Sequence, residues 1–123
     1  MYSAINIDSL VSQYKGTDFY TAIKEANIQI MQPGDHCFPE GTLAMVMDVL
    51  GYRYISVRSS LNFHQQRIAV ARAFYLHLQC ETMKTGECLV ITHEDTPLQN
   101  DTCLFASKLL NTSVLLKRTS VIV

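Results

Sequence analysis

The sequence predicts an α+β domain in which helices pack against a small, mostly antiparallel sheet. Two segments rich in β-forming residues, 43–49 and 52–57, flank the turn Leu50-Gly51, which predicts a hairpin. Helical periodicity precedes the hairpin and two longer helical patterns follow it, an order typical of helices that cover a sheet. With 123 residues, 48% of them apolar, we expect one domain over residues 1–123.

The N-terminal part is predicted to hold two short helices and one short strand. Residues 8–14 carry apolar side chains at helical spacing, and a second helix begins near Thr17 or Asp18, both favourable N-caps. The apolar face of this second helix is expected to hold Phe19, Ala22, Ile23 and Ala26. Residues 28–31 alternate like a strand and stop before a Pro-Gly pair.

A long helix is predicted directly after the hairpin. Asn62 is a good N-cap, and Gln65 three residues later completes a capping-box pattern. The inward face of this helix is expected to hold Ile68, Ala71, Phe74, Tyr75 and Leu78.

The C-terminal part is predicted to hold one further helix. Residues 88–92 form either a strand or a covered loop. Residues 96–99 supply a threonine cap, a proline in the first helical position and a glutamine at the third, which indicates a helix start. Its buried face takes Leu98, Thr102, Phe105, Ala106, Leu109 and Leu110. We expect an interruption at 111–113 and a short apolar tail at 121–123.

Composition excludes several classes of function. The net charge is −1, and no lysine or arginine run is present, so direct nucleic-acid binding is not expected. No signal peptide and no membrane span are visible, which predicts a cytoplasmic protein. The cysteines lack C-x-x-C spacing and are expected to be reduced: Cys37, Cys80, Cys88 and Cys103. Charged residues are 17%, so a partner or a second copy is expected to cover part of the surface.

Two segments resemble the ImmA/IrrE-type metallopeptidases. Residues 62–78 follow a hairpin and contain an R-x-x-x-A lead-in at 67–71, and residues 101–110 contain the pattern F-A-x-x-L-L. The resemblance implies a zincin-like minimal peptidase scaffold. In that family an H-E-x-x-H helix binds zinc with its two histidines and uses its glutamate as general base. Active members cleave or control repressors of phages and mobile elements.

The positions that would carry this chemistry hold other residues. Arg72 falls at the first histidine, Ala73 at the glutamate and Leu76 at the second histidine, while Asp101 falls at the third zinc ligand. A catalytic zinc needs three protein ligands and a water, so the resemblance implies that the zinc and the catalysis are lost. Arg72 would then pair with Asp101 and replace the metal as the link between the two helices.

The resemblance therefore implies a catalytically inactive, regulatory protein-binding module. Its partner would be a repressor of a phage or mobile element, or a related transcriptional regulator, and a homodimer is a further possibility. The groove between the two motif helices and the sheet is the expected binding place. It would be lined by Arg72, Leu76, His77, Asp101 and Phe105, with Tyr52 and Tyr54 on the sheet side.

Two catalytic alternatives compete with this interpretation. The first is a metal-dependent hydrolase or peptidase that holds zinc with His77, His93 and Asp101. The histidines are more simply explained as partly exposed residues in loops and at helix ends. The second is a thiol nucleophile formed by His36 and Cys37, which is disfavoured because adjacent side chains seldom face each other.

Overall fold

The computed structural model describes residues 6–15, 18–79 and 88–111. The elements in chain order are α1 (Ile7–Tyr14), α2 (Phe19–Glu25), β1 (Ile28–Met31), the 3₁₀ turn η1 (Asp35–Cys37), β2 (Thr42–Val49), β3 (Tyr52–Val57), α3 (Phe63–Gln79), β4 (Cys88–Thr92) and α4 (Pro97–Leu110). The predicted α+β class is confirmed. The expected apolar tail at 121–123 lies outside the described residues.

The four strands form one mixed sheet in the order β1-β3-β2-β4. β2 pairs antiparallel with both β3 and β4, whereas β1 runs parallel to β3, so the sheet is mostly antiparallel, as predicted. The β2–β3 hairpin closes through Leu50 and Gly51, which both have positive φ, at 55° and 86°. Positive φ at both central residues is what a type I′ hairpin turn requires, and glycine adopts this conformation without steric conflict. The predicted hairpin is confirmed.

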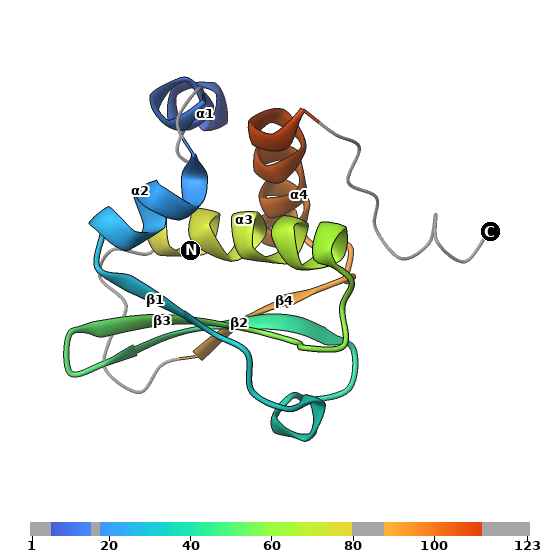
Figure 1. The fold of residues 1–123 in the computed structure, drawn as a ribbon. Helices are drawn as coiled ribbons and strands as arrows, with labels where there is room; N and C mark the ends of the chain where they lie inside the picture. The colour runs from blue at the N-terminus through green and yellow to red at the C-terminus, as the bar shows by residue number, and fades with distance from the viewer. Residues whose placement is uncertain (1–5, 16–17, 80–87, 112–123) are drawn as a thin grey trace.

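All four helices lie on one face of the sheet (Figure 1). α3 crosses this face in contact with β2, β3 and β4, and it packs against α4 on its other side. A continuous run from Ala69 to His77 is consequently buried, while Ile68 and Leu78 are only half-buried. The predicted inward face of five residues was too narrow. Helical periodicity predicts burial on one side of a helix, whereas α3 is covered by the sheet on one side and by α4 on the other.

The core lies between the sheet and α3. Five apolar strand residues are at most 1% exposed on this side: Ala44, Val46, Ile55, Val57 and Ile91. Aromatic rings fill the layer above, where Phe105 of α4 lies 5.3 Å from the Tyr75 ring and 6.5 Å from the Phe74 ring, between centroids. This packing fixes α4 against α3, and it positions the polar residues described next.

Local signals set most helix ends. Asn62 and Gln65 exchange hydrogen bonds of 2.8 and 3.0 Å, which confirms the predicted capping box. Asn111 ends α4 in the left-handed conformation, where an interruption was expected. Ala26 was wrongly placed on the buried face of the second helix, because α2 stops at Glu25 and Ala26 is its exposed C-cap. Within the described residues, no helix is long and apolar enough to cross a membrane.

Candidate functional site

The most unusual residue of the interior is Arg72, in the middle of α3. It is 1% exposed, and its guanidinium lies where α3, α4 and the end of β4 meet. Nε donates to Oγ1 of Thr102 at 2.8 Å. Nη2 donates to the carbonyl oxygen of Thr92 at 2.8 Å and to Oε1 of Gln99 at 2.9 Å. One side chain thus links three elements, and we call Arg72, Thr92, Gln99 and Thr102 the arginine node.

The side-chain amide of Gln99 forms two hydrogen bonds with the backbone of β4, as a neighbouring strand would. Its Nε2 donates to the carbonyl of Val90 at 2.7 Å, and its Oε1 accepts from the amide of Thr92 at 3.1 Å. A residue on a neighbouring parallel strand would bond to the same two groups, on either side of Ile91. The side-chain amide therefore satisfies part of the outer edge of β4 and at the same time accepts from Arg72.

Gln99 was predicted only as a capping residue. Its amide does donate to Oγ1 of Thr96 at 3.2 Å, but its side chain turns inward instead of back to the cap. Thr102 was expected on the buried face, and its hydroxyl both donates to the Gln99 carbonyl at 2.7 Å and accepts from Arg72. A glutamine and a threonine spaced three apart in a helix are too common to reveal such a role.

The arginine node contains a charge without a carboxylate. All three acceptors of Arg72 are neutral, and no ion pair joins it to another described residue. Burial lowers the pKa of Arg72, but a guanidinium keeps its proton in proteins because its ordinary pKa lies far above neutral pH. Burial likewise raises the pKa of the nearby Cys103 thiol, and the charge of Arg72 opposes that rise. The node is therefore a dry, cationic site.

The predicted pairing of Arg72 with Asp101 was wrong about the partner. The guanidinium bonds to Thr102, one residue further along α4. Successive helix residues point about 100° apart, so only one of these two side chains faces α3. Thr102 is fully buried in that position, while Asp101 is half-buried.

The seven residues expected to line a groove do not share one surface. Arg72, Leu76, His77 and Phe105 are at most 1% exposed and contact other residues of the chain. Tyr52 and Tyr54 lie on the sheet, and Tyr52 is 68% exposed. The space between α3 and α4 is filled by side chains, because the aromatic packing of Phe105 closes it.

His77 has a structural partner. Its Nε2 lies 3.0 Å from the carbonyl oxygen of Tyr54, and a carbonyl only accepts, so Nε2 carries the hydrogen. Burial lowers the pKa of His77, and the bond to the Tyr54 carbonyl opposes this only in part. The neutral ring therefore fastens α3 to β3.

The alternative zinc site has no matching geometry. Within residues 6–15, 18–79 and 88–111, no three His, Cys, Asp or Glu residues are placed to hold one metal ion. His77 is held by Tyr54, whereas His93 lines a different feature, a depression of about 310 Å³ shared with Glu40 and Glu94. The described residues therefore do not fit a zinc ion.

The sheet face opposite the helices is a second candidate site. Met45, Met47 and Val49 alternate with the buried residues of β2, and their cross-strand neighbours point the same way. We call this set the open sheet face: Gln29, Met31, Met45, Met47, Val49, Tyr52, Tyr54, Ser56, Cys88 and Val90. In Figure 1 the helices α1 to α4 all lie on the opposite side of the sheet, and of the described elements only the short turn η1 is drawn below it.

The open sheet face carries no charged residue and is mostly apolar, with Gln29 and the buried Ser56 as its small polar part. None of its ten members is Asp, Glu, Lys or Arg. Met31 is 47% exposed, Val49 38% and Tyr52 68%. Val49 and Tyr52 are cross-strand neighbours at the hairpin end, whereas Met31 lies towards the other end of the strands, opposite Ser56. Exposed apolar neighbours of this kind mark interaction sites, and methionine and tyrosine are enriched at interface centres. The pair Tyr52 and Tyr54 was expected at a binding surface, and the methionines extend that surface across β2.

No protein-family model, curated protein or solved structure matches the chain significantly. The resemblance to the ImmA/IrrE-type metallopeptidases therefore stays a proposal that rests on segments 62–78 and 101–110.

Proposed function

We propose that this protein is a catalytically inactive relative of the ImmA/IrrE-type metallopeptidases that regulates another protein by binding it. The arginine node carries this proposal. The resemblance puts a zinc ligand at Arg72 and another at Asp101, one on each motif helix. In this chain a guanidinium at that place joins the same two helices through Thr102 and Gln99. The guanidinium thus links the two helices by donating hydrogen bonds, where the metal of the family would link them by accepting electron pairs from its ligands.

The chemistry of hydrolysis has no residues to perform it at this place. Ala73 and Leu76 stand at the positions of the general base and the second histidine, and both are fully buried. Hydrolytic zinc also requires an open coordination position for water, whereas Arg72 is 1% exposed. A zinc ion next to the guanidinium would meet like charge in a medium of low dielectric constant.

The open sheet face supports a protein as the partner. Nucleic acids are bound mainly through lysine and arginine contacts to phosphate, and the face has neither. Its tyrosines and methionines suit an apolar protein surface instead. The partner that the resemblance implies is a repressor of a phage or mobile element, or a related regulator. Binding would act by masking a surface of that regulator or by shifting its assembly equilibrium.

The test compares two charge insertions at exposed apolar residues. Tyr52→Glu places a carboxylate on the open sheet face, and Leu104→Glu places one on α4, where Leu104 is 44% exposed. Each variant is used to capture proteins from the source cell, followed by mass spectrometry. We expect the wild type and Leu104→Glu to retain a transcriptional regulator that Tyr52→Glu loses.

Two results would overturn the proposal. One is equal capture by both variants, which would separate binding from the open sheet face. The other is peptide or ester hydrolysis that a chelator stops. Light scattering of the same samples shows whether a second copy of the chain occupies the face instead.

A further inference from the structure

The turn η1 presents a histidine and a cysteine together at the surface. His36 Nε2 and Cys37 Sγ are 3.6 Å apart, within reach of a hydrogen bond to sulfur, and both residues are exposed. The expectation that these neighbours do not face each other was therefore wrong. Neither residue belongs to the arginine node or to the open sheet face.

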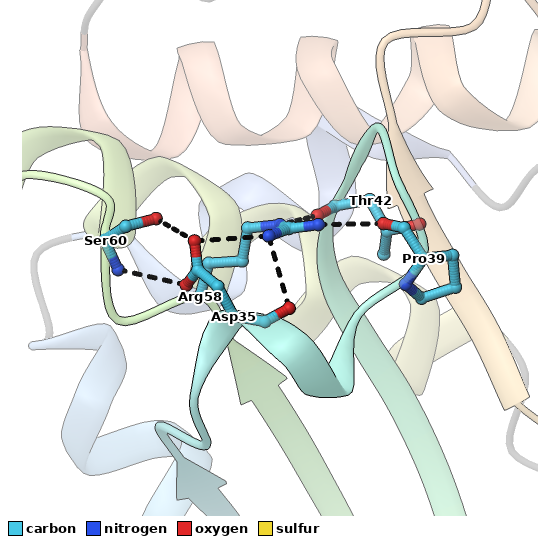
Figure 2. A network of polar contacts seen from close by, with 5 residues as sticks. All are labelled: Asp35, Pro39, Thr42, Arg58 and Ser60. Carbon is cyan, nitrogen blue, oxygen red and sulfur yellow. Dashed lines mark hydrogen bonds and ion pairs between the residues drawn. The ribbon is translucent and has the colours of Figure 1, made fainter.

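A second arginine holds this turn in place. Arg58, just after β3, forms a 3.2 Å ion pair with Asp35 and donates through Nη2 to the Pro39 carbonyl at 2.8 Å and through Nε to the Thr42 carbonyl. Asp35 also accepts from the hydroxyl and the amide of Ser60. Figure 2 shows that Arg58 lies between Asp35 at the start of this segment and Pro39 and Thr42 at its end, and bonds to all three. We call Asp35, Pro39, Thr42, Arg58 and Ser60 the loop clamp.

The backbone of the turn is fixed on both sides of the exposed pair. Phe38 is buried, and the Arg58 guanidinium carbon lies 5.2 Å from the centre of its ring. The Cys37 amide donates to the Gly34 carbonyl at 3.0 Å. The pair therefore stands on a rigid base, which favours one side-chain arrangement over many.

Gly34 makes room for the imidazole. Its φ of −61° and ψ of 156° suit any residue, so backbone conformation does not require glycine here. A Cβ at this position would lie only 2.8 Å from Cε1 and Nδ1 of His36. The ring thus rests against the bare backbone, and this position brings its other nitrogen to the thiol.

We propose that Cys37 is a modification site that reacts with small disulfides by thiol–disulfide exchange, with His36 as the group that accepts and returns its proton. His36 takes the proton from the Cys37 thiol, and the thiolate attacks one sulfur of a low-molecular-weight disulfide. A new S–S bond forms to Cys37 as the original S–S bond breaks. The departing thiolate then takes the proton from the imidazolium, so the products are a mixed disulfide and one free thiol.

The other described cysteines lack this arrangement. Cys88 is exposed, but its thiol donates to the Leu89 carbonyl, at 3.9 Å, and partial burial raises its pKa. Cys103 is buried, and burial raises its pKa too. A thiol is unreactive until it ionises, so the geometry selects Cys37 among the three.

The experiment measures the rate of mixed-disulfide formation with oxidised glutathione at pH 7. The parent variant, Cys80→Ser/Cys88→Ser, keeps Cys37, and the comparison variant, Cys37→Ser/Cys80→Ser, keeps Cys88. Both also keep the buried Cys103. Intact mass follows the reaction and peptide mapping locates it. We expect Cys37 to react about ten-fold faster than Cys88.

Three further variants of the parent test the role of the imidazole. His36→Gln removes it, Gly34→Ala displaces it while keeping an allowed backbone, and His64→Gln removes an exposed histidine elsewhere. The first two should react at the rate of Cys88, and the third at the parent rate. Equal rates for Cys37 and Cys88, or parent rates in both His36→Gln and Gly34→Ala, would overturn the proposal. Matching urea midpoints establish that each variant is folded.

Discussion

Two arginines of this chain both link segments that are distant in sequence, one in the buried interior and the other near the surface. Arg72 is 1% exposed and bonds only to neutral acceptors, whereas the Arg58 side chain is 17% exposed and pairs with the Asp35 carboxylate. The loop clamp holds η1 to the end of β3, and the arginine node holds α3 to α4 and β4.

The difference in burial shows which kind of interaction, ion pair or hydrogen bond, stabilises each cluster. A charge pair near water is weakened by solvent and adds little, so the loop clamp depends mainly on its bonds to backbone carbonyls. In the dry arginine node, desolvation of the guanidinium is offset by three well-directed hydrogen bonds. Removing Arg72 would leave buried oxygens of Thr92 and Gln99 short of a donor, which is the costlier defect.

Replacement of the two arginines should therefore have unequal effects. We expect Arg72→Ala to lower the free energy of unfolding by about 3 to 5 kcal/mol, through the lost hydrogen bonds and the cavity left behind. Arg58→Ala should lower it by about 1 to 2 kcal/mol. Urea unfolding measures both, and equal losses would show that burial of Arg72 adds nothing. Arg72→Lys, which keeps the charge but not the planar fork, should also be destabilised.

Substitution of Gln99 tests the comparison of the two arginines further, because Gln99→Glu gives Arg72 the carboxylate partner that Arg58 already has. Gln99→Leu should cost about 2 to 3 kcal/mol, since Val90, Thr92 and Arg72 all lose a partner. Gln99→Glu keeps both acceptor bonds and adds a charge pair with Arg72, losing only the donor to Val90. It should therefore be more stable than Gln99→Leu at pH 7. The opposite ranking would mean that the strand-like bond to Val90 dominates the node.

His77 gives the helix layer its own pH dependence. Burial lowers its pKa below the ordinary value near 6.5, so the unfolded chain takes up a proton before the folded chain does. Above that value neither state is protonated. As pH falls from 7 towards 5, the free energy of unfolding should decrease, by at most about 1.4 kcal/mol per pH unit for one proton. His77→Gln should flatten this part of the profile, and an unchanged slope would contradict the assignment.

Asp35 gives the loop clamp a different pH range. The Ser60 hydroxyl bond, with help from Arg58, lowers the pKa of Asp35 below its usual 3.8. A lowered carboxyl pKa stabilises the fold above the ordinary value, and this contribution is lost as pH falls through the folded value. The destabilisation by Arg58→Ala should thus shrink in acid, while that by Arg72→Ala should not. Urea unfolding of both variants at pH 5 and pH 3 measures this, with Asp35→Asn as the control.

The sequence anticipated those parts of the fold that local signals determine. The Leu50-Gly51 turn and the Asn62–Gln65 capping box need only neighbouring residues, and both are present. The arginine node needs β4 and α4 to approach α3 from different directions, which no local pattern encodes. The imidazole of His36 turns toward Cys37 because Gly34 leaves space for the ring. This space depends on how the chain folds, so the sequence pattern does not show it.

The open sheet face was foreseen only in part. In strand 42–49, Ala44 and Val46 alternate with Met45 and Met47, so apolar residues occur in both phases and the alternation alone does not tell which face the helices cover. Tyr52 and Tyr54 were expected at a binding surface, but together with residues of α3 and α4. Because side chains alternate along a strand, both tyrosines lie on the side of the sheet away from the helices. The residues expected to line one groove therefore divide between the buried core and the open sheet face.

The most direct test of the claim that Arg72 replaces a metal is the zinc content of the protein, purified without added metal or chelator. Elemental analysis should find far less than one zinc per chain, and a chelator should leave the urea midpoint unchanged. One equivalent of zinc, with a midpoint that falls on chelation, would contradict the account.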